Sequence, residues 1–155
     1  MTPRTRFVAG GSAMGLLALV GTMMWLGAGD ATPTKPDPGN PRLVAVGKAV
    51  YAQHCASCHG VNLDGQPNWR HQLPNGRWPA PPHDATGHTW HHPDEALFQV
   101  TKYGMRALIP DRETDMPGFE GVLSDADIWA ALSFIESNWS PEIRDRQKRM
   151  GQNAP

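Results

Sequence analysis

The stretch YAQHCASCHG, residues 51–60, holds both cysteines of the chain and places His59 directly after the second one. Two positions separate Cys55 from Cys58, so on a helix the two thiols lie about one turn apart. A pair of this kind serves as a redox dithiol, as part of a metal site, or as the attachment point of a larger group. The pair alone does not distinguish these chemistries, so the surrounding sequence has to do so.

Residues 7–29, FVAGGSAMGLLALVGTMMWLGAG, form a long run without a charged side chain, and Arg4 and Arg6 precede it. At about 1.5 Å of rise per residue, a helix over this run is long enough to cross a hydrocarbon layer of about 30 Å. The run exceeds the apolar region of about 7–15 residues in a secretory signal, and no clear small-residue cleavage site follows it. We therefore predict that residues 1–29 form an uncleaved transmembrane anchor, with a cleaved signal peptide as the alternative.

The two arginines also predict the location of the rest of the chain. Positive charge before an apolar run favours the cytoplasmic side for the N-terminus, so the remainder is expected on the periplasmic side. The prediction is a single-pass protein of the inner membrane, or a soluble periplasmic protein if the segment is cleaved. Outside the cytoplasm two neighbouring thiols tend to oxidise, so we expect another group to capture Cys55 and Cys58.

The remaining sequence divides into three parts by composition. Residues 30–40, DATPTKPDPGN, are rich in proline and predict an extended spacer. Residues 41–139 are expected to form the folded domain. Residues 140–155 are expected to form a charged, exposed tail with a short helix that Ser140 and Pro141 begin. The 14 basic and 15 acidic side chains give a formal net charge of −1, so no basic face for a nucleic acid is indicated.

Apolar spacing and helix-start signals predict three helices, over residues 41–54, 93–104 and 124–139. Asn40 and Pro41 are a typical helix start, and Ser124 with Asp127 is close to a capping box. The segments between the helices, of which residues 60–92 are the longest, are rich in Gly, Pro, His and Trp and show no periodicity. An all-α domain with such long irregular loops is expected to wrap around something that is not polypeptide.

The pattern C-x-x-C-H is the attachment pattern of a c-type haem. The two thiols can each add to a vinyl group of one porphyrin, and the following histidine is then held close to the iron. On this interpretation Cys55 and Cys58 carry the thioethers and His59 is the proximal ligand. The alternatives are a thioredoxin-type dithiol, which requires a βαβ context, a zinc site, which requires a fourth ligand, and a plain disulfide.

Three motifs in order, CASCHG, then MPGF some sixty residues later, then LSDADIWAALSFI, make residues 43–139 similar to the class I c-type cytochromes of bacteria. The resemblance implies the cytochrome c fold, in which three main helices and long loops surround one covalently bound haem c. With the N-terminal run, the chain resembles a membrane-anchored, single-haem member of this family.

The resemblance also implies several site residues. The distal iron ligand falls on Met116 in the M-P context, with Met105 as the alternative, and Met/His ligation raises the reduction potential. The carbonyl that accepts a hydrogen bond from the proximal His59 falls on Pro81, with Pro82 next. The first and last helices are expected to pack crosswise, with Gly47 and Tyr51 on one facing Ala131 and Phe134 on the other.

The indole N–H of Trp90 is a candidate donor to a haem propionate, and Trp69 is an alternative. Three arginines are further candidates for pairing with these carboxylates: Arg70, Arg77 and Arg106. The histidines His88, His91 and His92 in HTWHH suggest a copper or zinc site, although surface histidines are the more ordinary interpretation.

We interpret the chain as a membrane-tethered electron carrier rather than an enzyme, cycling between Fe(III) and Fe(II) without a bound substrate. Expected partners are a quinol-oxidising complex, a terminal oxidase or another periplasmic redox protein, and the chain could be a subunit of an oxidoreductase complex. A haem-based sensor or enzyme subunit with a labile sixth ligand is the first alternative. A copper-handling module that uses the histidine-rich loop is the second.

Overall fold

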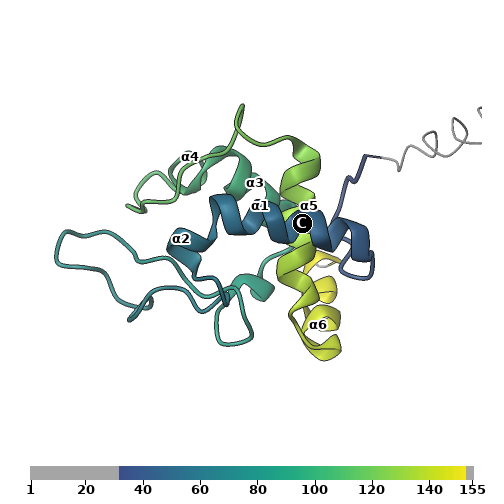
Figure 1. The fold of residues 1–155 in the computed structure, drawn as a ribbon. Coiled ribbons are helices and arrows are strands. Elements are labelled where there is room, and N and C mark those ends of the chain that lie inside the picture. The colour runs from purple at the N-terminus through teal and green to yellow at the C-terminus, as the bar shows by residue number, and fades with distance from the viewer. Residues whose placement is uncertain (1–31, 153–155) are drawn as a thin grey trace, which may run out of the picture. The chain divides into compact units, whose positions relative to one another are not determined.

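Six α-helices and one short 3-10 helix are the regular elements of residues 32–152, the part of the chain that the computed structural model describes (Figure 1). Within this part there is no β-strand, and a single isolated bridge joins Trp78 to Thr114. The predicted all-α class is therefore confirmed for these residues. The predicted anchor over residues 1–29 lies outside the described residues, and among those described no helix is long and apolar enough to span a membrane.

Helix α1, Pro41–His54, begins where the sequence predicts it. The side-chain oxygen of Asn40 accepts hydrogen bonds from the backbone N–H groups of Arg42 and Leu43 at 3.1 and 3.2 Å. Proline at the first helical position loses no hydrogen bond, because its missing N–H would have had no partner inside the helix. The helix ends at Cys55, and α2, Ala56–His59, follows at once.

Helices α3, Asp94–Tyr103, and α5, Asp125–Ser137, correspond to the other two predicted helices. Ser124 and Asp127 form a complete capping box at the start of α5. Three single-turn elements were not predicted: α2, the 3-10 helix η1, Thr89–His91, and α4, Met105–Leu108. Elements this short have no apolar periodicity to reveal them.

Helix α1 crosses α5 in the core of the domain, as Figure 1 shows. Gly47 makes this approach possible, because a Cβ atom there would overlap the backbone carbonyl of Ala130 and lie 3.0 Å from Phe134 Cβ. The Tyr51 and Phe134 rings pack with centroids 5.3 Å apart. The predicted crosswise packing, with a small residue of one helix against an aromatic residue of the other, is thus present between Gly47 and Phe134, and the Ala130 backbone adds to the contact.

Helix α6, Pro141–Gln152, forms where a short tail helix is expected, but it packs onto the domain instead of being exposed all round. Ile143 packs against the hydrophobic core, and Gln147 is only 2% exposed. The Gln147 amide donates a hydrogen bond to Asp94 Oδ1 at 2.6 Å. Arg144 donates to the backbone carbonyl of Trp139 at 2.6 Å. The packed face of α6 cannot be recognised from its charged sequence, because the buried residue on this face is the polar Gln147.

The carboxyl group of Glu136 is buried at the junction of α5, α3 and α6. Glu136 is 4% exposed and lies within hydrogen-bonding reach of the carboxyl of Asp94 and the amide of Gln147. Burial, followed by the nearby negative charge of Asp94, raises the pKa of Glu136 from 4.5 to about 8. The folded protein therefore holds a proton here at neutral pH that the unfolded chain releases.

This retained proton predicts a pH dependence of stability. Between about pH 4.5 and pH 8 the folded state binds more protons than the unfolded state, so the free energy of unfolding falls as pH rises. The fall is on the order of a few kcal/mol, since one pKa unit corresponds to about 1.4 kcal/mol. Glu136→Gln mimics the protonated form and should remove most of this slope, as measured by denaturant unfolding at pH 5, 7 and 9.

The matched control is Glu120→Gln, which changes an exposed glutamate and should leave the slope as in the wild type. Equal slopes in the wild type and in the Glu136→Gln variant would show that Glu136 carries no extra proton in the folded state.

Candidate functional site

The C-x-x-C-H motif lies on one helical turn. The backbone N–H groups of Cys58 and His59 both donate to the carbonyl of Cys55, at 3.1 and 2.9 Å. Both cysteines are free thiols, with Cys58 exposed and Cys55 half-buried. Burial, and then the proximity of Cys58, raises the pKa of the Cys55 thiol to about 11. Because neither cysteine is in a disulfide, both sulfur atoms are free to bond to a group that lies against this turn, and the raised pKa keeps Cys55 a neutral thiol until then.

The ring of His59 is buried and held by one hydrogen bond. Its Nδ1 atom lies 2.8 Å from the carbonyl oxygen of Pro81. A carbonyl only accepts hydrogen bonds, so Nδ1 carries the hydrogen and Nε2 keeps a lone pair, as a metal ligand requires. Burial also lowers the pKa of His59, which favours the neutral ring. The expected contact is made with Pro81 and not with Pro82.

Tyr51 ties the motif to the helix crossing. Its hydroxyl lies 3.0 Å from the carbonyl oxygen of Gly60 and 3.3 Å from that of His59, and it donates to these acceptors. Burial raises the pKa of Tyr51, so the group stays a neutral donor. This role of Tyr51 goes beyond the predicted helix packing, because no local sequence pattern reveals a bond from its hydroxyl to the motif.

Met116 lies in the loop between α4 and α5 and is half-buried. Its backbone N–H donates to Thr114 Oγ1 at 3.3 Å. The next turn of the loop is fixed to the end of α3, where the Phe119 N–H donates to the carbonyl of Thr101 at 3.1 Å. Gly118 allows this contact, since a Cβ there would lie 2.7 Å from the Tyr103 carbonyl carbon. The MPGF segment is therefore held at a defined place, and the role of Met116 as an iron ligand stays a prediction.

Arg77 joins the loop after the motif to the loop that carries Met116. Its guanidinium donates to the carbonyl of Thr114 at 2.6 Å and forms an ion pair with Asp115. The backbone of Trp78 adds a hydrogen bond to the carbonyl of Glu113 at 2.9 Å. The guanidinium of Arg77 thus pairs within the protein, beside Met116. Its Nε, however, is buried and has no hydrogen-bond partner among residues 32–152, so its pairing with a propionate stays a prediction. The other two arginines also have protein partners, the Thr86 carbonyl for Arg70 and Glu113 for Arg106.

Trp90 presents a buried donor that lacks an acceptor. Its indole Nε1 is buried and has no hydrogen-bond partner among residues 32–152. An unsatisfied buried donor costs about 1–3 kcal/mol, so this position is suited to a ligand that brings an acceptor. The alternative tryptophan, Trp69, instead stacks on the ring of His88 with centroids 5.2 Å apart. A haem propionate is an acceptor of the required kind for Trp90.

The histidine-rich loop does not bring three ligands together in a metal site in the described structure. His88 and His92 meet edge to face with centroids 5.3 Å apart. In the described part of the chain, however, no three His, Cys, Asp or Glu side chains come together in a group that could hold a metal ion. No metal site with three such ligands is therefore assembled by these residues, and a copper site that uses His88 with His91 or His92 alone stays a prediction.

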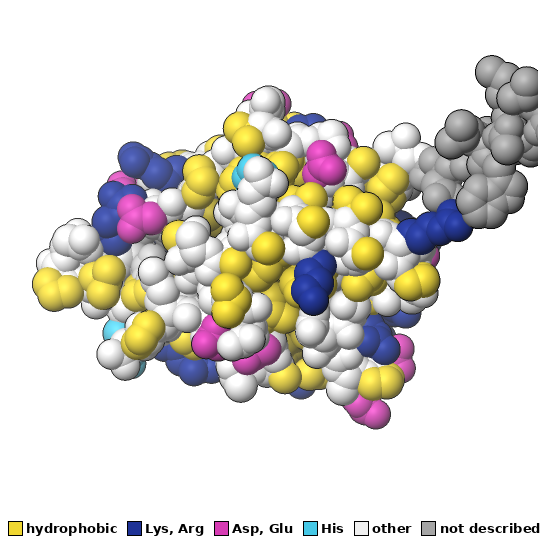
Figure 2. Space-filling model, in the orientation of Figure 1, with side chains coloured by type: hydrophobic (Ala, Val, Ile, Leu, Met, Phe, Trp, Pro, Cys, Tyr) yellow, Lys and Arg dark blue, Asp and Glu magenta, His cyan; other side chains and the backbone are white. Residues whose placement is uncertain are grey.

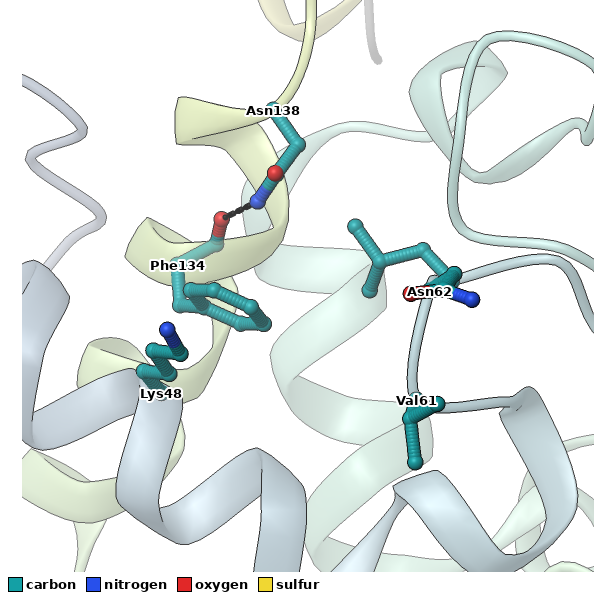
Figure 3. A pocket seen from close by; sticks show the side chains of 6 residues that line it. Lys48, Val61, Asn62, Phe134 and Asn138 are labelled. Carbon is teal, nitrogen blue, oxygen red and sulfur yellow. Dashed lines mark hydrogen bonds between the residues drawn. The ribbon is translucent and has the colours of Figure 1, made fainter.

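A small hollow beside the motif contains none of the predicted site residues (Figure 3). The Phe134 side chain and the loop after the motif border it, and its lining consists of Lys48, Val61, Asn62, Leu63, Phe134 and Asn138. We therefore place the candidate site at the motif, Pro81 and Trp90, and not in this hollow.

Comparison with known proteins adds to the geometry of the motif. The family model described as cytochrome c oxidase, cbb3-type, subunit III matches residues 42–135, a range that contains every predicted site residue. The chain belongs to this family. Membership of the cbb3-type subunit III family confirms the prediction of a c-type cytochrome, and it implies binding of haem c and electron transfer by that haem.

One curated relative matches as well. Thiosulfate dehydrogenase of Stutzerimonas stutzeri (strain A1501) is 30% identical over 115 residues, which is 74% of this chain. The matched region is 33% of the relative, so the chain spans about a third of that enzyme's length. No solved structure matches this member of the cbb3-type subunit III family.

Proposed function

We propose that the chain is a single-haem, membrane-tethered electron carrier with its haem domain on the periplasmic side. The observation that carries the proposal is the hydrogen bond from His59 Nδ1 to the Pro81 carbonyl. It fixes the tautomer with a free Nε2, on the same helical turn that presents Cys55 and Cys58. The haem, when bound, supplies one-electron transfer between Fe(III) and Fe(II).

Each residue of the site would make a different contact with the haem. Cys55 and Cys58 attach it, His59 is its proximal ligand and Met116 is its distal ligand. Trp90 donates its unpaired indole N–H to a propionate. A single C-x-x-C-H motif and two cysteines in this sequence support one haem.

The motif end of the domain is open to a partner. Cys58 is exposed, and Val61, three residues later, is 77% exposed. On the face of the domain shown in Figure 2, exposed hydrophobic side chains are interspersed with polar and charged ones. An attached haem would thus have an edge at the surface, where electrons can pass to another protein without substrate binding. We propose a quinol-oxidising complex, a terminal oxidase or another periplasmic carrier as that partner.

The tether is supported by the sequence of the N-terminal segment. The uncharged residues 7–29 would anchor the chain. Of the predicted spacer, residues 30–40, the later part packs on the domain, because Pro36 is buried and the Asp37 N–H donates to Ser133 Oγ at 2.9 Å. Only the residues before Pro36 would then hold the domain off the membrane. After fractionation of cells, a tethered protein stays with the membranes after an alkaline wash. Release into the soluble fraction by the wash would favour the cleaved form.

The function is tested on the full chain made in a host that attaches haem c. The wild type should keep its haem on a denaturing gel and should titrate as one reversible one-electron centre. The reduced wild type should not bind carbon monoxide rapidly. Changing both Cys55 and Cys58 to Ser should remove haem from the denatured chain. Ser57→Ala, a change within the same turn at an exposed position, is the matched control and should keep it.

Rapid binding of carbon monoxide at neutral pH would show an open sixth position. That result would contradict the carrier assignment and favour a sensor or small-ligand enzyme.

A further inference from the structure

The imidazole ring of His83 packs face to face on the ring of His59. The ring centroids are 4.0 Å apart and the planes are inclined by 24°. Pro81, whose carbonyl bonds His59 Nδ1, lies two residues before His83. One short segment therefore contacts His59 twice, with a carbonyl at the edge of the ring and an aromatic ring on its face.

The side chain of His83 is held in one tautomer. Its Nδ1 atom lies 2.9 Å from Thr89 Oγ1, and the same hydroxyl donates to the carbonyl of Pro82 at 3.3 Å. Because that hydroxyl has only one hydrogen to donate, its oxygen accepts from Nδ1–H of His83.

The backbone of His83 is fixed on both sides. Its N–H donates to the carbonyl of Leu63 at 2.8 Å, and its carbonyl accepts from the indole Nε1 of Trp139 at 2.7 Å. The ring of Tyr51 meets the His83 ring edge to face, with centroids 6.0 Å apart. Rotation of the ring would break its contact with Tyr51 and its bond to Thr89, and the backbone bonds hold the residue in place, so His83 is a rigid support for the ring of His59.

We propose that His83 is a positioning residue for His59: it sets the orientation of the ligand ring and keeps a polar group beside the iron. This inference rests on the proposed function of His59 as the proximal ligand. Groups behind a ligating histidine orient its ring and tune the metal. A polar neighbour favours the more highly charged oxidised haem over the reduced one, whereas a hydrocarbon does the opposite.

The test uses the full-length holoprotein with His83→Leu, which removes the ring, and His83→Phe, which keeps a ring but loses the bond to Thr89. His83→Leu should favour the reduced haem by about threefold or more in a redox titration, and should change the electron paramagnetic resonance signal of the oxidised haem. His83→Phe should also favour the reduced haem, while its resonance signal stays closer to that of the wild type.

The matched control is His71→Leu, a change of an exposed histidine in the same loop, which should leave both readouts unchanged. If the His83 variants lose stability but keep the wild-type potential and resonance signal, His83 is structural only and the proposal is overturned. Absence of haem from the wild type, or rapid carbon monoxide binding to it, would instead overturn the proposed function and this inference with it. Should His83→Leu not fold, Thr89→Val tests the same support and is expected to shift the potential in the same direction.

Discussion

Replacing Gly47 by alanine is expected to destabilise the protein by about 1–2 kcal/mol, although alanine is the better helix former. The added Cβ would overlap the backbone carbonyl of Ala130 on α5 and press on Phe134. A backbone carbonyl cannot turn aside as a flexible side chain can, so the helices must separate, and overpacking of this kind costs about 1–3 kcal/mol or more. The helix propensity gained, about 1 kcal/mol, offsets only part of the cost. Denaturant unfolding of the holoprotein measures the difference.

The effect should reach the site, because Tyr51 lies one turn after Gly47 and donates to the carbonyls of His59 and Gly60. A smaller yield of attached haem is therefore expected together with the lower stability. Gly151→Ala in α6 is the matched control, since a Cβ there would only make ordinary contact with Pro93 at 3.6 Å. It should be neutral or stabilising by less than about 1 kcal/mol. Equal stability of Gly47→Ala and the wild type would mean that the close crossing is not required.

The features that the sequence predicted correctly depend on short-range chemistry. The start of α1 follows from Asn40 and Pro41, and the start of α5 from Ser124 and Asp127. Each signal acts within one helical turn, so it can be recognised in the sequence without knowledge of the fold. The C-x-x-C-H motif is local in the same sense, because one turn brings its thiols and its histidine together.

The features that were missed depend on contacts between distant segments. Arg77 pairs with Asp115 on another loop, and nothing near either residue reveals the other as its partner. Gln147 was assigned to an exposed tail because amides are mostly at surfaces, yet its hydrogen bond to Asp94 lets it be buried. The stack of His83 on His59 is of the same kind, since it requires the loop to return to the motif.

Replacing Met116 by alanine is expected to lower the reduction potential by about 100 mV or more, which is nearly two powers of ten at about 59 mV per tenfold. A neutral thioether as the distal ligand favours the reduced iron, and alanine offers no donor in its place. The sixth position would then open, so the reduced variant should bind carbon monoxide while the wild type does not. A redox titration and carbon monoxide mixing measure both effects on one preparation.

Met105→Ala is the matched comparison, because Met105 is also half-buried and was the alternative ligand. Met116 and Met105 differ in the contacts that fix their segments of the chain. The Met116 segment is bound through Thr114, through the pairing of Arg77 with Asp115, and through the contact of Gly118 with the end of α3. Such a segment can keep a sulfur at a fixed place, so Met105→Ala should leave the potential unchanged. The reverse outcome, in which Met105→Ala changes the potential and Met116→Ala does not, would show that Met105 in α4 is the distal ligand.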